Sequence, residues 1–192
     1  MKPRILAFAG STRTKSFNKM LVTLAAKEAE AAGSDVTLID LRDYPMPLYD
    51  GDLEETKGFP ENAVKLYDLF KQHDGLLLAC PEYNSSISGV WKNTIDWVSR
   101  PRSGEEYLAA FTGKTAAIFS ASIGALGGLR GLVHVRAILN NINVLVIPSQ
   151  VTIPNASQVF SENGTINDKK IVDKVSAISR ELVETTKRLK AL

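Results

Sequence analysis

The sequence predicts an α/β protein in which helices cover both faces of a parallel sheet. Short apolar runs of strand length alternate along the chain with segments whose apolar residues recur at helical spacing. The runs are apolar throughout instead of alternating between apolar and polar residues, which is typical of parallel strands buried on both faces. This repeated βα order is the one that doubly wound sheets require.

Three strands are predicted in the first half of the chain. They are the runs ILAFA at residues 5–9, DVTLID at 35–40 and GLLLAC at 75–80. Because parallel neighbours need crossover connections, we expect a helix in each interval between them. The apolar residues that recur at helical spacing there are Phe17, Met20, Leu21, Leu24 and Ala25, then Val64, Leu66, Leu69 and Phe70.

Two further strands are predicted in the second half, TAAIFSA at residues 115–121 and NVLVIP at 143–148. Segments with apolar residues at helical spacing lie before the first of these strands, between the two, and after the second. The apolar residues concerned are Val90, Ile95 and Val98, then Leu132, Val135, Ile138 and Leu139, and finally Ile171, Val175, Ile178, Leu182, Val183 and Leu189.

Five such βα units most simply form a three-layer α/β/α protein with the flavodoxin-like strand order 2-1-3-4-5. Ligands of such sheets bind beyond the carboxyl ends of the strands, at the switch between strands 1 and 3. Two longer irregular stretches, residues 42–60 and 148–168, are expected to be functional or interfacial.

Composition narrows the class of protein. The 192 residues are 44% hydrophobic and 23% charged, and we expect residues 1–192 to form a single domain. The net charge of +2 arises from interspersed charges, which provide no basic patch for nucleic acid, and no apolar stretch approaches the length of a membrane span. The apolar run after MKPR is too short for a signal peptide, and one cysteine excludes an intrachain disulfide and a multi-cysteine metal site. We expect a cytoplasmic protein that acts on small molecules.

The turn after the first strand, GSTRTKSFN at residues 10–18, is rich in hydrogen-bond donors. It leads into a helix N-terminus, where free backbone N–H groups and the helix dipole attract an anion. Hydroxyl and amide groups and one guanidinium can add to this, from Ser11, Thr12, Arg13, Ser16 and Asn18. The sequence lacks GxxxxGK[ST], and GxGxxG does not follow the first strand, so a terminal monophosphate is the favoured ligand. In the alternative interpretation, Ser16 only caps the helix and the rest is a polar turn.

The loops after the third and fourth strands should open at the same edge of the sheet. In residues 81–100, Pro81 stiffens the chain and Tyr83 offers an aromatic face beside the amides of Asn84 and Ser85, which suits a flat heteroaromatic ring. Residues 120–131, SASIGALGGLRG, have small side chains that let a planar ligand approach the backbone. The alternative for this last loop is a flexible glycine turn.

GSTRTKSFN together with PEYNSSISGVWKNTIDW resembles the NAD(P)H-dependent FMN reductase family, which includes azo-dye, quinone and chromate reductases on a flavodoxin-like fold. The resemblance spans roughly residues 4–150. It implies that the first loop binds the FMN phosphate and the PEYN-type loop wraps the isoalloxazine and ribityl groups. A looser match places the loop after the fourth strand near the flavin. The residues implicated are Ser11, Arg13, Ser16 and Asn18; Pro81, Glu82, Tyr83, Asn84 and Ser85; and Ser120, Ser122 and Gly124.

The resemblance implies bound FMN and NADPH or NADH as cosubstrate, with quinone, azo, free-flavin or metal-oxyanion acceptors. Hydride passes between nicotinamide and flavin, so no catalytic side chain and no metal are expected. His73 and His134 are interpreted as structural, and Cys80 as a small buried hydrophobe. Glu82 is expected to contribute its backbone amide. The second serine of NSS departs from many relatives and bears on acceptor choice.

The resemblance also implies a homodimer or a dimer of dimers in which each flavin site borrows from a neighbour. Trp91 and Trp97, with Tyr49 and Asp50 of the long loop, are candidates for such an interface because large aromatic residues are favoured there. The alternative places both tryptophans in the core of one subunit.

Two other functional classes stay open. A flavodoxin-type electron carrier would hold FMN without a nicotinamide site, although the slightly basic chain favours it less, and a phosphate-binding module would have no turnover. The choice between NADPH and NADH depends on a basic side chain near the 2′-phosphate, for which Arg100, Arg102 and Arg130 are candidates.

Overall fold

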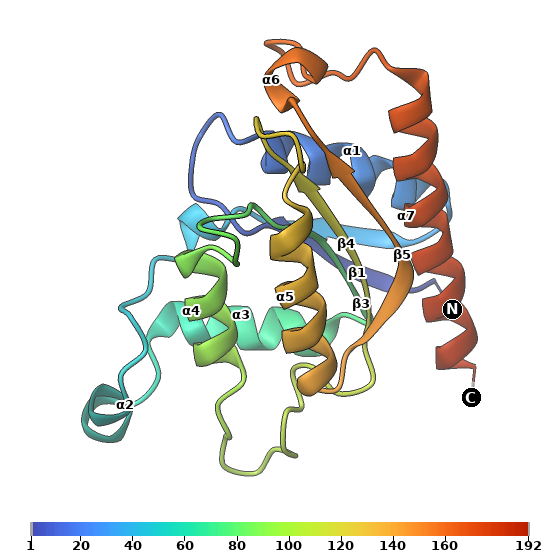
Figure 1. Cartoon of the computed structure of the whole chain (residues 1–192). Coiled ribbons are helices and arrows are strands. Elements are labelled where there is room, and N and C mark those ends of the chain that lie inside the picture. Colours follow the sequence, from blue (N-terminus) through green and yellow to red (C-terminus); the bar gives the residue numbers. More distant parts are fainter. Residues whose placement is uncertain (1, 192) are drawn as a thin grey trace.

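A computed structural model describes residues 2–191 of the chain. Its centre is a five-stranded sheet of parallel strands in the order β2-β1-β3-β4-β5, which confirms the predicted topology (Figure 1). The strands are β1 (Arg4–Ala9), β2 (Asp35–Leu38), β3 (Gly75–Ala79), β4 (Thr115–Ala121) and β5 (Leu145–Ile153). The α-helices are α1 (Phe17–Ala31), α2 (Gly51–Lys57), α3 (Glu61–Gln72), α4 (Gly89–Val98), α5 (Leu129–Asn141), α6 (Ala156–Val159) and α7 (Lys169–Lys190), and η1 (Leu41–Asp43) is a 3₁₀ turn.

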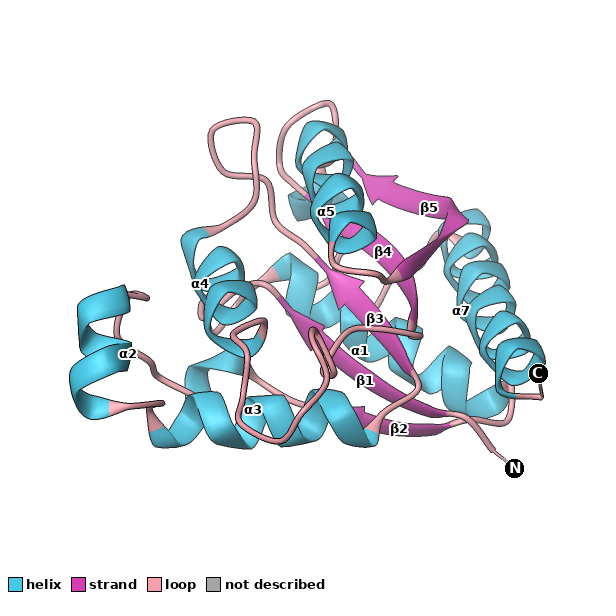
Figure 2. Cartoon of the chain, turned by 90° about the horizontal axis from the view of Figure 1, so that it is seen from below, coloured by secondary structure: helices cyan, strands magenta, loops and turns pink. Residues whose placement is uncertain are grey.

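The sheet is buried on both faces, as its uniformly apolar strands predict. Successive strand residues point to opposite faces, so Leu6 and Phe8 pack under α3, α4 and α5 while Ile5 and Ala7 pack under α1 and α7. Figure 2 shows these two helical layers on either side of the strands. Within residues 2–191, no helix has both the length and the apolar character that a membrane span needs.

The fifth strand differs from its predicted bounds of 143–148, because it begins at Leu145 and continues past Pro148 to Ile153. β5 lies at the edge of the sheet, and its register against β4 shifts between Ala116 and Ile118. A bulge on an edge strand accommodates a proline, which has no N–H for the ladder. Part of the stretch expected to be irregular, 148–168, is therefore strand.

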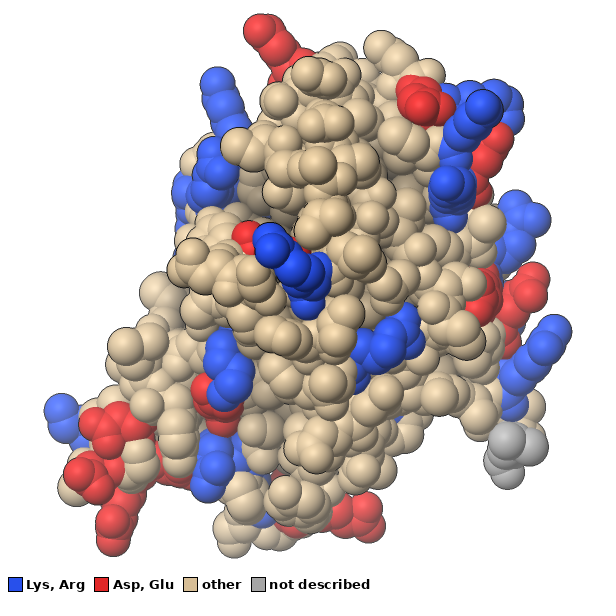
Figure 3. Space-filling model, in the orientation of Figure 1, with Lys and Arg blue, Asp and Glu red and all other residues tan. Residues whose placement is uncertain are grey.

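The other long stretch, residues 42–60, also contains regular structure. It includes the end of η1 and all of α2, a helix without any buried residue in the described chain, which stands away from the sheet in Figure 1. Its acidic residues gather at the lower left of Figure 3. The stretch is held to the body by Asn93 and Trp97, which donate hydrogen bonds to the Pro47 carbonyl at 2.9 Å each.

Both tryptophans lie in the core of the single chain, and their interpretation as interface residues is wrong. Trp91 and Trp97 have no exposed surface. The Trp91 ring packs edge-on against Phe8, with ring centroids 5.0 Å apart, and the Trp97 ring packs against Tyr49 at the same distance. Both side chains come from α4, and these contacts pack that helix against β1 on one side and against the long loop on the other.

Candidate functional site

A cavity of about 280 Å³ lies where the loops after β1, β3 and β4 meet, beyond the carboxyl ends of these strands. This is the switch point at which the strand order predicts a ligand. The cavity brings residues of all three predicted loops together. Its lining consists of Ser11, Arg13, Ser16, Phe17, Asn18, Pro81, Glu82, Tyr83, Ala121, Ser122 and Ile123.

The N-terminus of α1 is open toward this cavity. Ser16 precedes the helix in an extended conformation and is 5% exposed, yet within the described chain its hydroxyl makes no capping bond to the helix. The first turn of α1 also holds no acidic residue. The first backbone N–H groups of a helix have no partner inside it. They are therefore available to an anion, and the capping bond that the alternative interpretation of Ser16 requires is absent from residues 2–191.

The loop before α1 is fixed from two sides. Ser11 is buried, and its hydroxyl accepts a hydrogen bond from the Arg13 backbone N–H at 3.3 Å. On the outside, the guanidinium of Arg42 donates from Nε to the Thr12 carbonyl at 2.9 Å. Sequence reasoning missed Arg42 because nothing in the sequence relates η1 to a loop thirty residues earlier. The Arg13 side chain is exposed at the rim of the cavity.

Asn18 lines the cavity, but its side chain is engaged elsewhere. Its Nδ2 donates to the Ala121 carbonyl at 2.9 Å, and its Oδ1 accepts from the Ala121 N–H at 3.0 Å. This pair of bonds joins α1 to the end of β4 and satisfies the last backbone groups of that strand. The expected contact of Asn18 with a phosphate is thereby left mainly to its backbone N–H.

The PEYN segment, residues 81–84, leads into a tight two-residue turn at residues 83–86, which we call the PEYN turn. Tyr83 and Ser86 exchange backbone hydrogen bonds of 2.9 and 3.0 Å, and the residues between them, Asn84 and Ser85, have φ values of 50° and 65°. Asparagine tolerates this left-handed conformation better than most residues, which explains its place in the motif. Asn84 and Ser85 shape the turn and do not line the cavity in the described chain, whereas Pro81 and Tyr83 do.

Glu82 uses its carboxylate as well as its place in the loop. Oε1 accepts from Arg130 Nε at 2.8 Å, and Oε2 accepts from the Gly131 N–H at 3.1 Å in the first turn of α5. Burial by itself raises the pKa of Glu82, but the hydrogen bonds from Arg130 and Gly131 outweigh it and hold that pKa below its usual value. The carboxylate therefore joins the PEYN segment to α5.

Of the residues predicted for the site in and after β4, not all line the cavity. Ser120 has no exposed surface, and its hydroxyl donates to the Cys80 carbonyl at 2.7 Å, so it ties β4 to β3 and does not line the cavity of the described chain. Ser122 does line it, and its hydroxyl accepts a hydrogen bond at 3.1 Å from the N–H of Gly124, which does not line the cavity in the described chain. Phe17, Ala121 and Ile123 are apolar lining residues that donor-based motif reasoning does not detect.

The glycine turn of this loop is required by packing and is not a flexible linker. Gly128 has φ +90°, and a Cβ there would lie 1.9 Å from the Ser120 hydroxyl oxygen. A Cβ on Gly127 would lie 2.7 Å from the backbone of Ile153. The small residues allow the turn to cross directly over the ends of β4 and β5.

Several other expectations can be compared with the structure. The His73 ring bonds to the Leu69 carbonyl at 2.6 Å and to the Thr37 hydroxyl at 2.8 Å, and burial lowers its pKa. His134 Nδ1 lies 2.8 Å from the Ser86 hydroxyl, on the outside of the PEYN turn. Cys80 is buried, which raises the pKa of its thiol to about 12. The two histidine rings are therefore engaged in hydrogen bonds within the fold, and the thiol of Cys80 is enclosed by the core.

The three arginines considered for the 2′-phosphate are engaged in other contacts. Arg130 pairs with Glu82, and Arg100 lies over the Tyr49 ring, with its Nε 3.3 Å from Glu54. Arg102 stacks on the Tyr67 ring, 3.9 Å from its centroid. Glu82, the partner of Arg130, lines the cavity, whereas Glu54, Tyr49 and Tyr67 do not line it in the described chain.

The strand order, the two helical layers and the cavity at the switch point define a flavodoxin-like α/β protein. Solved structures agree on the fold. The flavoenzyme NAD(P)H:(acceptor) oxidoreductase FerB of Paracoccus denitrificans superposes with a TM-score of 0.79 at 24% identity, covering 97% of this chain and 98% of that one.

The sequence comparisons identify the family. Residues 3–158 match the family model of NADPH-dependent FMN reductases, and the chain belongs to this family of oxidoreductase enzymes. It is 32% identical over 191 residues to a quinone reductase of Escherichia coli, covering 98% of both chains. It is 35% identical over 183 residues to an NAD(P)H-dependent FMN reductase of Pseudomonas aeruginosa, covering 94% of this chain and 89% of the relative.

Proposed function

We propose that the protein binds FMN in the cavity beyond the carboxyl ends of β1, β3 and β4. The FMN-bound protein then transfers hydride equivalents from NADPH or NADH to quinones and related small acceptors. The observation that carries the proposal is the open N-terminus of α1, whose buried Ser16 has no capping role in the described chain, at the wall of a cavity that the PEYN turn also lines. An anionic group attached to a flat ring matches this combination.

The first loop fits the phosphate end of FMN. The hydroxyls of Ser11 and Ser16 and the first backbone N–H groups of α1 offer donors, and Arg13 adds a positive charge at the rim. No carboxylate opposes them in the first turn of this helix within residues 2–191. A dianionic phosphate is therefore compatible with the charge and the donors of this end of the cavity.

The opposite wall fits the ring and the ribityl chain. Pro81 and Tyr83 present a stiff backbone and an aromatic side chain that is 51% exposed, while Ser122 and Ile123 close the wall from β4. When bound, FMN supplies the hydride chemistry. The residues of the chain bind and orient it, and the contact of Glu82 with α5 holds the PEYN turn in position.

The acceptor proposal extends from quinones to azo compounds, free flavin and metal oxyanions. Quinones come first because the Escherichia coli relative is named as a quinone reductase. An open cavity with an exposed Ile123 (69%) and Tyr83 provides little to discriminate among flat acceptors. Broad acceptance is the expected behaviour.

The test is anaerobic addition of NADPH or NADH to the purified FMN-loaded protein, with the same concentration of free FMN as control. We expect rapid loss of the oxidised flavin absorbance, faster than for free FMN, and its return when a quinone is added. A flavin that becomes reduced only through a separate reductase would instead identify an electron carrier. A protein that does not retain FMN would contradict the proposal entirely.

The proposal includes assembly into a homodimer or a dimer of dimers. Four apolar side chains that are 42–69% exposed surround the start of α5 beside the cavity, namely Ile123, Leu126, Leu129 and Val133. The exposed Arg130 lies among them and is paired with Glu82, and above the central charged group the face shown in Figure 3 carries few charged side chains. Contiguous exposed apolar patches mark interaction sites, and a second copy seated here would adjoin the cavity.

A further inference from the structure

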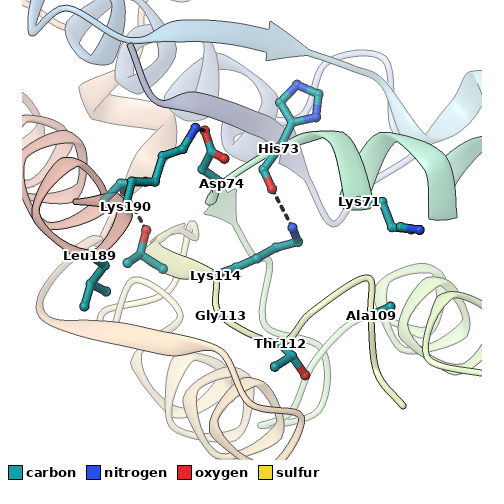
Figure 4. Close-up of a pocket in the computed structure, with 11 residues that line it drawn as sticks. Lys71, His73, Asp74, Ala109, Thr112, Gly113, Lys114, Leu189 and Lys190 are labelled. Carbon is teal, nitrogen blue, oxygen red and sulfur yellow. Dashed lines mark hydrogen bonds and ion pairs between the residues drawn. The ribbon is translucent and has the colours of Figure 1, made fainter. Parts of the chain in front are cut away.

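A second cavity, of about 270 Å³, lies at the opposite end of the strands from the first, near the amino ends of β3 and β4 (Figure 4). The end of α3, the loop before β4 and the end of α7 form its walls. Its charged and hydroxyl-bearing residues include Lys71, Asp74, Thr112, Lys114, Thr115 and Lys190. This cavity is separate from the proposed flavin site, because the two occupy opposite ends of the strands.

Two of the three lysines have carboxylate partners. Lys71 Nζ lies 2.6 Å from both carboxylate oxygens of Glu105, and Lys190 Nζ lies 2.8 Å from Asp74 Oδ2. The positive charges of these two walls are therefore balanced by the protein itself.

Lys114 is different. It is 6% exposed, and its Nζ donates to the backbone carbonyl of His73 at 2.5 Å, a contact drawn in Figure 4. Among residues 2–191, no carboxylate forms an ion pair with it. A buried ammonium with only a neutral partner is costly, so it favours either loss of its proton or arrival of a counter-ion.

The charges around Lys114 also bear on the cost of keeping its ammonium buried. Burial lowers the pKa of Lys114 to about 8; Asp74 opposes the shift, while Arg4 and Lys71 add to it. At neutral pH the ammonium form still predominates, and it has two protons beyond the one given to His73. The Thr112 hydroxyl accepts a long bond of 3.4 Å from Asn143 Nδ2 and keeps its own proton for another acceptor.

We propose that this cavity is a binding site for a small oxyanion, a carboxylate or a phosphate group, with Lys114 as its cationic partner and Thr112 as a hydroxyl donor. The charge of the bound anion compensates the one ammonium of the cavity that lacks a carboxylate among residues 2–191. The lysines disfavour a metal cation in the same space.

The proposal is tested by titrating the ¹⁵N-labelled full chain with inorganic phosphate and, separately, with acetate, at an ionic strength held constant with chloride. We expect saturable shifts of the Gly113 and Lys114 backbone amide resonances with at least one of the two. Saturation with phosphate alone or with acetate alone supports the site and identifies its ligand class. Shifts that stay linear in concentration with both anions would overturn it.

Two variants separate specific binding from general screening. Lys114→Met should weaken the saturable binding by about tenfold or more, because a hydrogen bond to a charged group is lost. Lys170→Met, which removes an exposed lysine at the start of α7, should leave it unchanged. Equal saturation in Lys114→Met and the unaltered chain would contradict the assignment.

A measurement on the unaltered chain keeps the proposal testable if Lys114→Met does not fold. A bound anion stabilises the ammonium form, so the pKa of Lys114, followed by its side-chain NMR resonances, should rise when the anion saturates. By linkage, the affinity should fall as the pH rises through that pKa. A pKa that is unchanged at saturating anion would overturn the role of Lys114.

Discussion

At the scale of single residues, Ser16 and Asn18 illustrate how neighbours in one motif divide their tasks. Both are buried at the start of α1. The Ser16 hydroxyl makes no capping bond in the described chain and lines the cavity, whereas the Asn18 amide is engaged by both backbone groups of Ala121. The motif predicted donors for an anion, but only the position of β4 determines which of them is already used.

Arg13→Ala tests the phosphate assignment. We expect the variant to bind FMN about tenfold more weakly or worse, because a charge-assisted hydrogen bond contributes roughly 1.5–3 kcal/mol. Titration of flavin fluorescence measures the affinity. Arg180→Ala, an exposed arginine on α7, is the matched control and should bind FMN normally. Equal affinity of the two variants would contradict the assignment.

Glu82→Gln tests the contact between the PEYN turn and α5. The folded protein lowers the pKa of Glu82, so its ionised form stabilises the fold. This advantage should be complete above the pKa of an unfolded glutamate, about 4.3, and should be lost as the pH falls below that value. Urea unfolding at several pH values should show a difference of about 1 kcal/mol between the two proteins at neutral pH, which shrinks in acid.

The control for this measurement is Glu184→Gln, an exposed carboxylate on α7. It should show a smaller difference at neutral pH. A difference between the unaltered chain and Glu82→Gln that grows in acid would show that the carboxylate does not stabilise the fold.

At the scale of elements, β5 shows why the strand was predicted to end at Pro148, five residues too early. Pro148 ends the apolar run, yet the strand continues because it lies at the sheet edge and bulges there. Arg136 donates to the carbonyls of Ile147 at 2.8 Å and Val146 at 3.1 Å, which satisfies acceptors at the irregularity. A side chain ten residues earlier on α5 thus permits what local propensity disfavours.

Gly128→Ala tests the glycine turn that crosses the sheet. The variant should lose about 3 kcal/mol of unfolding free energy, because a Cβ would lie 1.9 Å from the Ser120 hydroxyl and φ is +90°. Gly33→Ala is the control, because Gly33 has φ +91° but only the flexible end of Lys187 lies nearby, at 3.5 Å. It should lose about 1 kcal/mol. Adding Ser120→Ala to Gly128→Ala should restore part of the loss; equal losses in the two glycine variants would contradict the steric explanation.

At the scale of the whole molecule, the burial of both tryptophans means that the proposed dimer interface must use other residues. The tryptophans fill the core beside α4, so an interface needs other apolar surface. The exposed side chains around the start of α5 provide it. This location lies next to the cavity, which agrees with a site completed by a neighbour.

Val133→Asp tests this surface. A charge introduced at the centre of an interface should raise the dissociation constant of the dimer by about tenfold or more. Sedimentation analysis measures it, with Val64→Asp on α3 as a control that should leave the assembly intact. A monomeric unaltered chain, or a Val133→Asp protein that sediments like it, would contradict the proposed surface.

The sequence by itself determined the alternation of the five strands with their crossover helices, the strand order and the end of the strands at which the cavity lies, but not the short helices α2 and α6. Buried parallel strands and amphipathic helices leave a local periodic signal, and the strand ends place residues such as Ser11, Pro81 and Ser122 at one edge. The PEYN turn carries its own signal too, because Asn84 suits a left-handed backbone.

Only the tertiary structure decided which polar side chains are free. Ser120, Asn18 and Glu82 are bound to Cys80, Ala121 and Arg130, partners that lie 40 to 103 residues away in the chain. It also decided that Lys114 meets a carbonyl instead of a carboxylate. Hydrogen bonds of this kind depend on distances between segments that the chain brings together only on folding, and local sequence contains no record of them.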